Sequence, residues 1–164
     1  MQDLASAVVV RLPRSDAERL EREASRLGIG LEEYVLELLL RNLDPLERAR
    51  EYAEAARGLL ERAREELERG DVRQAAGEAW GAAALAVKAY AAWRDGKRLT
   101  SHEGLWEYKR VMKKDLGERV SDAWYAGQSM HVCFYEGWCA REGVEEALER
   151  IKRLVEEVEK RVEA

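Results

Sequence analysis

The sequence predicts an all-α protein, an up-and-down helical bundle preceded by a short strand and a helical hairpin. Apolar residues recur at helical spacing in most stretches, and Gly or Pro separates the stretches. One stretch, Asp71 to Asp95, is so rich in alanine that it is expected to be the buried central helix. Only one short run, Ala7 to Leu12, is rich in β-branched residues, and it is expected to form a strand closed by Pro13.

Residues 1–43 are predicted to be a separate N-terminal part in which the strand precedes two helices. Ser15 and Glu18 have the spacing of a capping box, so the first helix is expected to begin there and to end at Gly28. The second helix is expected to run from Leu31 to Asn42 with a broad apolar face. Together these helices form the expected hairpin.

This order of elements is also that of ribbon-helix-helix proteins, in which paired strands of two chains read DNA. A reading strand needs polar side chains on its outer face, yet Arg11 is the single base-reading candidate between Ala7 and Leu12. A packing or dimerisation appendage is therefore the main interpretation of residues 1–43, and DNA reading is the alternative.

Residues 44–164 are predicted to form the bundle itself. Asp44 and Pro45 are expected to start a long helix that ends at Arg69. The two-residue turn Gly70-Asp71 then makes this helix antiparallel to the central one. Three further helices are expected: one capped by Thr100 and Glu103, an aromatic one from about Glu118 to Cys139, and an amphipathic one after Gly143.

One strip of the central helix carries small residues and a single cation, namely Gly77, Gly81, Ala84 and Lys88. Small residues at this spacing allow either a close-packed neighbour or a shallow groove. The Lys88 side chain is expected to point to solvent, or else to be a cation at the rim of the groove. In the second case it contributes to an anion-binding surface with Lys97, Arg98 and His102.

The composition limits the function classes. Charged residues make up 37% of the chain, acids and bases are intermixed, and Asn and Gln are scarce, as in heat-adapted proteins. The net charge of −5 argues against bulk nucleic-acid binding as the default. No stretch is apolar enough to span a membrane and no secretory signal is evident, so a cytoplasmic protein without membrane contact is expected.

Two cysteines, Cys133 and Cys139, fall six residues apart in one predicted helix. They are expected to lie on different faces and to remain reduced, because this spacing does not suit an intrahelical disulfide. A zinc site that joins them to His131 is unattractive, since residues two apart on a helix differ in direction by about 200°. No nucleotide-binding, hydrolase or metalloprotease motif occurs, so neither metal nor cofactor is expected.

The chain has only two histidines, which limits the candidates for chemistry. His131 falls on the aromatic face of the helix that also carries Tyr135, and it is either a core histidine or an acid or base that lines a cleft. His102 falls at a predicted helix N-terminus beside Lys97 and Arg98. It is either an ordinary exposed first-turn residue or part of a phosphate site.

Four segments together resemble the archaeal PaREP family: LDPLERA at Leu43 to Ala49, GDVRQAAGEAWGAAALAVKA at Gly70 to Ala89, LTSHEGLW at Leu99 to Trp106, and HVCFYEGW at His131 to Trp138. That family is itself similar to the HEPN helical-bundle superfamily. The resemblance covers most of residues 44–164 and implies a HEPN-like helical bundle and a homodimer.

Active HEPN proteins are typically metal-independent RNases with an Arg four to six residues before a His. Here His131 matches the His, but Trp124, Tyr125 and Ala126 occupy the Arg positions. The main hypothesis is therefore a non-catalytic module that binds a nucleotide, RNA or a partner protein, and its candidate binding residues are His131, Lys88, Lys97, Arg98, His102 and Tyr135. A divergent RNase that uses His131 is the alternative.

Overall fold

The computed structural model describes residues 9–164, and within that range it contains seven helices and no strand. The chain divides into two compact units, residues 1–43 and 44–164. The prediction of an all-α protein is thus confirmed for the part of the chain that the structure describes. None of its helices combines the length and the hydropathy needed to cross a bilayer.

The first unit contains the helices α1 (Arg14–Leu27) and α2 (Leu31–Leu40). The predicted strand is wrong for residues 9–12, which are irregular, and its beginning at Ala7 lies outside the described residues. A β-branched run needs a neighbouring strand to pair its backbone groups, and the described chain offers none. The ribbon-helix-helix interpretation therefore gains no support.

The boundaries of α1 and α2 also differ from the prediction. α1 follows Pro13 directly and has no side-chain cap, so the capping box predicted from Ser15 is wrong. Proline already holds its backbone near φ −65°, which prepares the chain for a helix start one residue later. Gly28, at φ 71°, ends α1 as predicted, and α2 ends two residues before Asn42.

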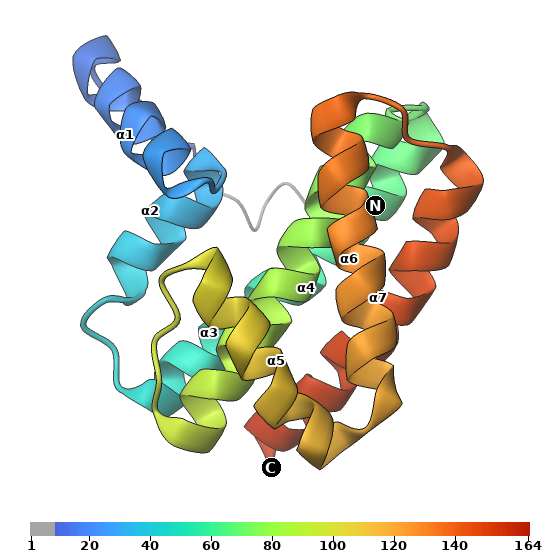
Figure 1. Cartoon of the computed structure of the whole chain (residues 1–164). Helices are drawn as coiled ribbons and strands as arrows, with labels where there is room; N and C mark the ends of the chain where they lie inside the picture. The colour runs from blue at the N-terminus through green and yellow to red at the C-terminus, as the bar shows by residue number, and fades with distance from the viewer. Residues whose placement is uncertain (1–8) are drawn as a thin grey trace. The chain divides into compact units, whose positions relative to one another are not determined.

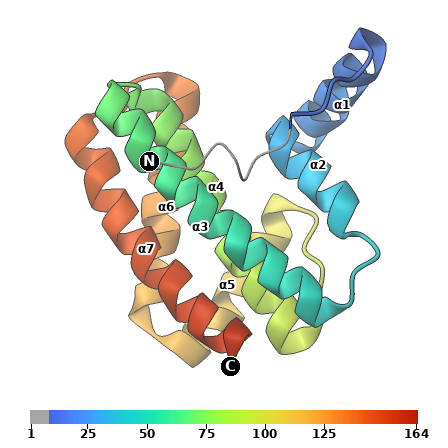
Figure 2. The same cartoon turned by 180° about the vertical axis from the view of Figure 1, so that it is seen from behind.

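The second unit is a bundle of five helices arranged around the central α4 (Figures 1 and 2). α4 contacts each of the other four helices, and its residues from Ala82 to Ala92 are all buried. This result confirms the central helix predicted from the alanine-rich stretch. The helices are α3 (Pro45–Arg69), α4 (Val72–Asp95), α5 (His102–Leu116), α6 (Glu118–Glu136) and α7 (Arg141–Glu163).

The helix starts in the bundle follow local capping chemistry. The Asp44 side chain accepts hydrogen bonds from two backbone N–H groups of α3, and the Asp71 side chain accepts one from Gln74, as predicted. α5 is capped by Ser101 rather than by Thr100, because the Ser101 hydroxyl accepts the Gly104 N–H at 2.9 Å.

The small-residue strip of α4 is close-packed against its neighbours and leaves no groove at these positions. A Cβ atom on Gly77 would lie 2.9 Å from the Phe134 ring, and one on Gly81 would lie 2.9 Å from a Leu59 methyl group. Lys88, at the end of the strip, is only 5% exposed, so the expectation that it points to solvent is wrong. The strip thus serves helix packing.

A hydrogen-bonded network joins the C-terminal part of α4 to α5. Tyr90 donates to Asp115 at 2.7 Å, Tyr108 donates to Asp95 at 2.7 Å, and Arg94 contacts both carboxylates. The tyrosine hydrogen bonds and the Arg94 guanidinium lower the pKa of both carboxyl groups. Burial, followed by the contact with Asp115, raises the pKa of Tyr90 to about 12. The two carboxyl groups of the network are therefore ionised, and their hydrogen bonds hold α5 against α4.

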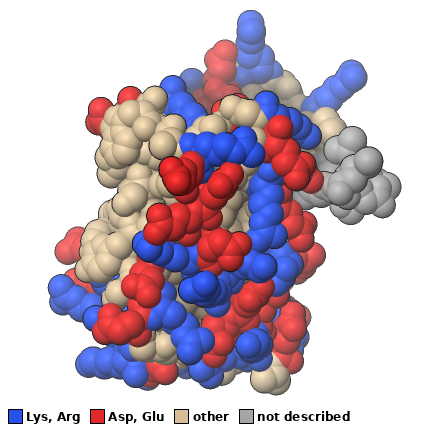
Figure 3. All heavy atoms as spheres, turned by 90° about the vertical axis from the view of Figure 1, so that its right-hand side faces the viewer, with Lys and Arg blue, Asp and Glu red and all other residues tan. Residues whose placement is uncertain are grey.

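Charges of both signs are mixed on one face of the bundle. Figure 3 shows Lys and Arg interspersed with Asp and Glu on the face where α7 lies. Two of the ion pairs tie α7 to other helices: Arg57 to Glu159 at 2.8 Å and Arg119 to Glu157 at 3.0 Å. Exposed pairs of this kind contribute little individually, so the apolar contacts of α4 dominate the stability of the bundle.

Gly127 on α6 provides a direct test of this packing. A Cβ atom there would lie 2.9 Å from the Ala83 Cβ, which cannot move without the α4 backbone. We expect Gly127→Ala to reduce the free energy of unfolding by about 1–3 kcal/mol, the usual cost of overpacking. Gly58→Ala on α3 is the matched control, because its new methyl group meets no atom within 4 Å.

The control should stabilise the protein by about 0.5–1 kcal/mol, since alanine is the better helix former. Chemical denaturation of the two variants and the wild type measures both effects. Equal stabilities of the two variants would contradict the close α4–α6 contact.

Candidate functional site

The two histidines of the chain meet on one surface of the bundle. His102 is the first residue of α5 and His131 lies in α6, and their rings stack at an interplanar angle of 26° with centroids 5.8 Å apart. The Trp80 ring of α4 contacts both, with centroids 5.5 Å from His102 and 4.9 Å from His131. Three helices therefore build one aromatic–histidine cluster.

Two further aromatic rings, those of Trp124 and Tyr135, pack against this cluster. Trp124 is fully buried and packs edge-on against Trp80, with centroids 5.4 Å apart. Tyr135, one turn after His131, packs edge-on against that imidazole at 5.0 Å. Trp80, which packs on the buried Trp124, holds the two imidazoles in place. The imidazole edges remain partly open to solvent, because His102 is exposed and His131 is half-buried.

The cluster continues along the line where α5 and α6 face each other, which we call the α5–α6 seam. The two helices run antiparallel along it, since His102 pairs with His131 at one end and Lys109 pairs with Tyr125 at the other. Between these ends the Gln128 amide lies 3.4 Å from the His102 Nε2 atom. The seam is formed by His102, Trp106 and Lys109 of α5 and by Tyr125, Gln128, His131 and Tyr135 of α6.

The surroundings of His131 favour the neutral imidazole. Burial lowers the pKa of His131 below its ordinary value of 6.5, and the nearby positive charge of His102 lowers it further. A neutral imidazole has one N–H donor and one acceptor nitrogen. His131 can therefore accept a hydrogen bond or a proton at neutral pH.

The structure brings together three of the six predicted site residues: His102, His131 and Tyr135. Lys88 lies eight residues along α4 from Trp80, roughly 12 Å at the usual helical rise, and it is buried there. Lys88 is thus remote from the histidine pair.

Lys97 and Arg98 lie in the loop that precedes α5. The charge of Lys97 contributes to the lowered pKa of Asp95, so this side chain lies near the carboxylate network. Arg98 is half-buried and forms interactions of its own. A common anion-binding surface of Lys97, Arg98 and the histidine pair stays a prediction.

Sequence reasoning missed Trp80, Trp106, Lys109 and Gln128. His102, Trp106 and Lys109 follow each other at helical spacing of four and three residues, a signal that they share one face of α5. Their partners on α6 depend on the register of two helices. In residues 9–164, no group of three or more His, Cys, Asp or Glu side chains is placed to hold a metal ion.

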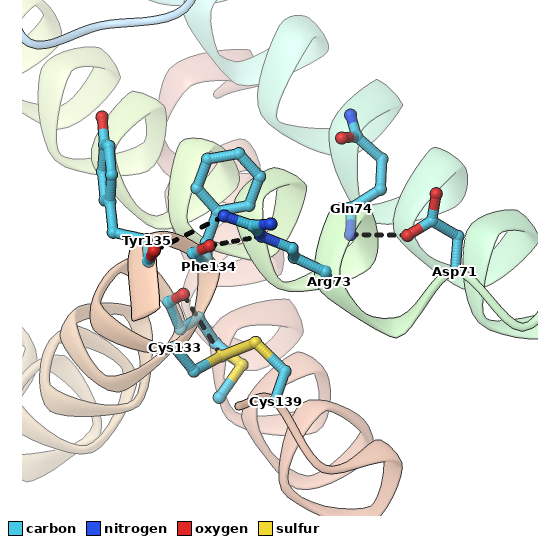
Figure 4. Close-up of a disulfide and its surroundings, with 8 residues drawn as sticks. Asp71, Arg73, Gln74, Cys133, Phe134, Tyr135 and Cys139 are labelled. Carbon is cyan, nitrogen blue, oxygen red and sulfur yellow. Dashed lines mark hydrogen bonds between the residues drawn. A yellow bond between two sulfur atoms is a disulfide. The ribbon is translucent and has the colours of Figure 1, made fainter. Parts of the chain in front are cut away.

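The expectation of two reduced cysteines is wrong, because Cys133 and Cys139 form a disulfide (Figure 4). α6 ends at Glu136, and Gly137, at φ 79°, turns the chain so that the two Cα atoms lie 5.0 Å apart. The predicted helix to Cys139 was therefore three residues too long. The cytoplasmic location stays a prediction.

Arg73 of α4 also fastens this end of α6. Its Nε donates to the Phe134 carbonyl at 2.6 Å and its Nη2 to the Tyr135 carbonyl at 3.4 Å, as Figure 4 shows. The guanidinium also lies over the Phe134 ring, 5.4 Å from its centroid. These bonds satisfy carbonyl groups at the helix end, where no intrahelical donor remains. They hold in place the turn of α6 that carries Tyr135.

The fold and the site thus define an all-helical protein with an aromatic–histidine surface. Residues 51–155 match the archaeal PaREP1/PaREP8 family, and because this range covers most of the chain, the protein belongs to that family. The resemblance of the sequence to PaREP proteins is confirmed. Neither the curated proteins nor the solved structures contain a significant match.

The electrostatics of the histidine pair can be measured by NMR, since only two imidazoles titrate. We expect the His131 ring to titrate below pH 6.5 in the folded protein, and its pKa to rise in His102→Phe, which removes the neighbouring charge. Because the folded-state pKa lies below the unfolded one, His131 should destabilise the protein as pH falls below about 6.5. A His131 pKa at or above 6.5 would contradict the half-buried site.

Proposed function

We propose that this chain is a non-catalytic binding module for single-stranded RNA or nucleotides, whose bases stack on the α5–α6 seam. The observation that carries the proposal is the cluster of Trp80, His102 and His131, in which rings from three helices converge on one partly exposed surface. Such rings offer flat faces to a base, and the imidazole edges and the Gln128 amide offer hydrogen-bonding atoms.

The energetics of such a site suit the overall charge of the protein. Stacking of one base on an aromatic side chain contributes about 1–3 kcal/mol, and it needs no positive field over the whole molecule. The chain carries a net charge of −5, so non-specific attraction of a polyanion is weak. Binding through local rings and a few cations is compatible with this charge, whereas binding through a broad basic face is not.

We further propose that the bundle is HEPN-like and that the protein is a homodimer. The support for a dimer is the pair of apolar side chains that α6 and the following turn expose outside the seam: Val132 is 47% and Trp138 is 63% exposed. Apolar groups gathered along one helix are typical of interaction surfaces. Sedimentation equilibrium tests this part of the proposal, and a monomer at all accessible concentrations would refute it.

The histidine pair also favours a second candidate function, metal-independent cleavage of RNA. In that reaction neutral His131 takes the proton of a ribose 2′-hydroxyl, whose oxygen attacks the adjacent phosphorus. Protonated His102 gives a proton to the departing 5′-oxygen, which leaves a 2′,3′-cyclic phosphate. One observation argues against cleavage. The positions that hold an Arg in active HEPN proteins are occupied here by Trp124, Tyr125 and Ala126, so no cation from them can stabilise the transition state at the phosphate.

The binding proposal is tested by fluorescence anisotropy with a labelled single-stranded oligouridylate. We expect Trp80→Ala and His102→Ala to weaken binding by about 10-fold or more, the loss that corresponds to one stacked base. Trp93→Ala is the control, because Trp93 lies at the other end of α4 and contacts Tyr90. Circular dichroism of each variant verifies that the fold is retained.

His131→Phe separates the two candidate functions, because phenylalanine keeps a ring for stacking but cannot transfer a proton. We expect this variant to bind the oligonucleotide with nearly wild-type affinity. If the wild type instead cleaved the RNA in the presence of a metal chelator, and His131→Phe abolished cleavage at unchanged stability, the non-catalytic proposal would be wrong.

A further inference from the structure

Lys109, at the far end of the seam from the histidines, is an unusual lysine. Only 6% of the residue is exposed, although lysine is rarely buried without an ionic partner. Its ammonium group contacts two neighbouring rings, 4.5 Å from the Trp106 centroid and 4.1 Å from the Tyr125 centroid. The Nζ atom also donates a hydrogen bond of 2.8 Å to the Tyr125 hydroxyl.

The contacts of Lys109 do not neutralise its charge. No carboxylate among the described residues forms an ion pair with it, and its hydrogen-bond acceptor is a neutral hydroxyl. Ring faces attract a cation, but they carry no net negative charge. Since a buried charge without a counter-charge is costly, this position favours an anion supplied from outside the chain.

The Tyr125 hydroxyl is the group that such an anion would meet. Because its oxygen accepts the hydrogen bond from Lys109, its own hydrogen remains available for donation. Tyr125 is 53% exposed, so this hydroxyl belongs to a side chain that solvent reaches. The hydrogen bond from Lys109 lowers the pKa of Tyr125, and the charges of Lys113 and Arg110 lower it further. The hydroxyl thus lies in a positive local field.

We propose that Lys109, Tyr125 and Trp106 form a phosphate subsite at the end of the α5–α6 seam. Lys109 supplies the positive charge, Tyr125 donates a hydrogen bond to a phosphate oxygen, and the Trp106 ring holds the ammonium through a cation–π contact. The subsite rests on the proposed function in that the phosphate belongs to a bound nucleotide or RNA strand. The same chemistry also suits a free phosphate ion.

The placement of this subsite fits one strand that follows the seam. Lys109 lies seven residues after His102, about 10 Å along α5 at the usual helical rise. His102 and the Lys109 ammonium therefore lie on one strip of the same helix. A ligand that stacks on the rings can place a phosphate against Lys109 without leaving the seam.

The decisive experiment compares Lys109→Met with Lys114→Met across a series of salt concentrations. Both substitutions remove one positive charge from α5, but Lys114 lies five residues further on and faces another direction. The probes are a short single-stranded oligouridylate, uridine 5′-monophosphate, uridine and inorganic phosphate. Tyr125→Phe is a milder variant that removes only the hydroxyl and keeps the exposed ring.

We expect Lys109→Met to weaken oligouridylate binding by about 10-fold or more, the usual effect of losing a charged hydrogen bond. It should also reduce the slope of log affinity against log salt by about 0.7, the value for one phosphate contact of a single strand. Tyr125→Phe should lose part of the affinity, and Lys114→Met should keep the wild-type affinity. Uridine, which lacks a phosphate, should bind wild type and Lys109→Met equally.

Intact oligouridylate binding with the wild-type affinity and salt slope in Lys109→Met would overturn the subsite and leave the proposed function standing. If the wild type bound neither oligouridylate nor nucleotide, the proposed function would fail, and the inorganic phosphate arm would then decide. Broadening of the phosphate ³¹P signal by the wild type but not by Lys109→Met supports a free-phosphate site. Absence of that broadening overturns the subsite as well.

Discussion

The contact of Gly127 with α4 determines how closely α6 approaches the central helix, and the candidate site depends on that distance. A Cβ atom at this position would lie 2.9 Å from the Ala83 Cβ and 3.3 Å from the Trp80 ring. Without a side chain there, the Trp80 ring can lie against α6 and reach His131 and His102 together. The absence of a side chain at Gly127 thus allows His102 and His131, which are far apart in the sequence, to meet at Trp80.

The seam that results combines two chemical environments. At one end, partial burial keeps His131 neutral beside Trp80, which suits stacking and uncharged hydrogen bonds. At the other end, the Lys109 ammonium contacts two rings and has no carboxylate partner in the described chain. A ligand with flat heterocycles and anionic linkers satisfies both ends, and this is why a nucleotide fits better than an apolar peptide or a metal ion.

Local signals predicted the helices well, because capping and periodicity act over a few residues. Asp44 and Asp71 cap the helices that they were expected to cap, and the alanine-rich stretch is the buried centre. Two local signals failed, since Ser15 and Thr100 do not cap α1 and α5, and other failures involved the packing of the bundle or the end of a helix. Lys88 is buried by neighbouring helices, and Gly137 ends α6 early enough for Cys133 to reach Cys139. Both histidines were individual candidates, but their pairing depends on the register of α5 and α6, which involves residues far apart in the sequence.

The central claim, that Trp80 and the two histidines form one ligand surface, can be tested most directly by NMR titration with single-stranded oligouridylate. The imidazole signals of His102 and His131 and the indole signal of Trp80 should shift together and give one dissociation constant. The indole of Trp93, remote from the seam on α4, should stay unchanged. Binding of the oligonucleotide without a shift of both imidazoles would contradict the account.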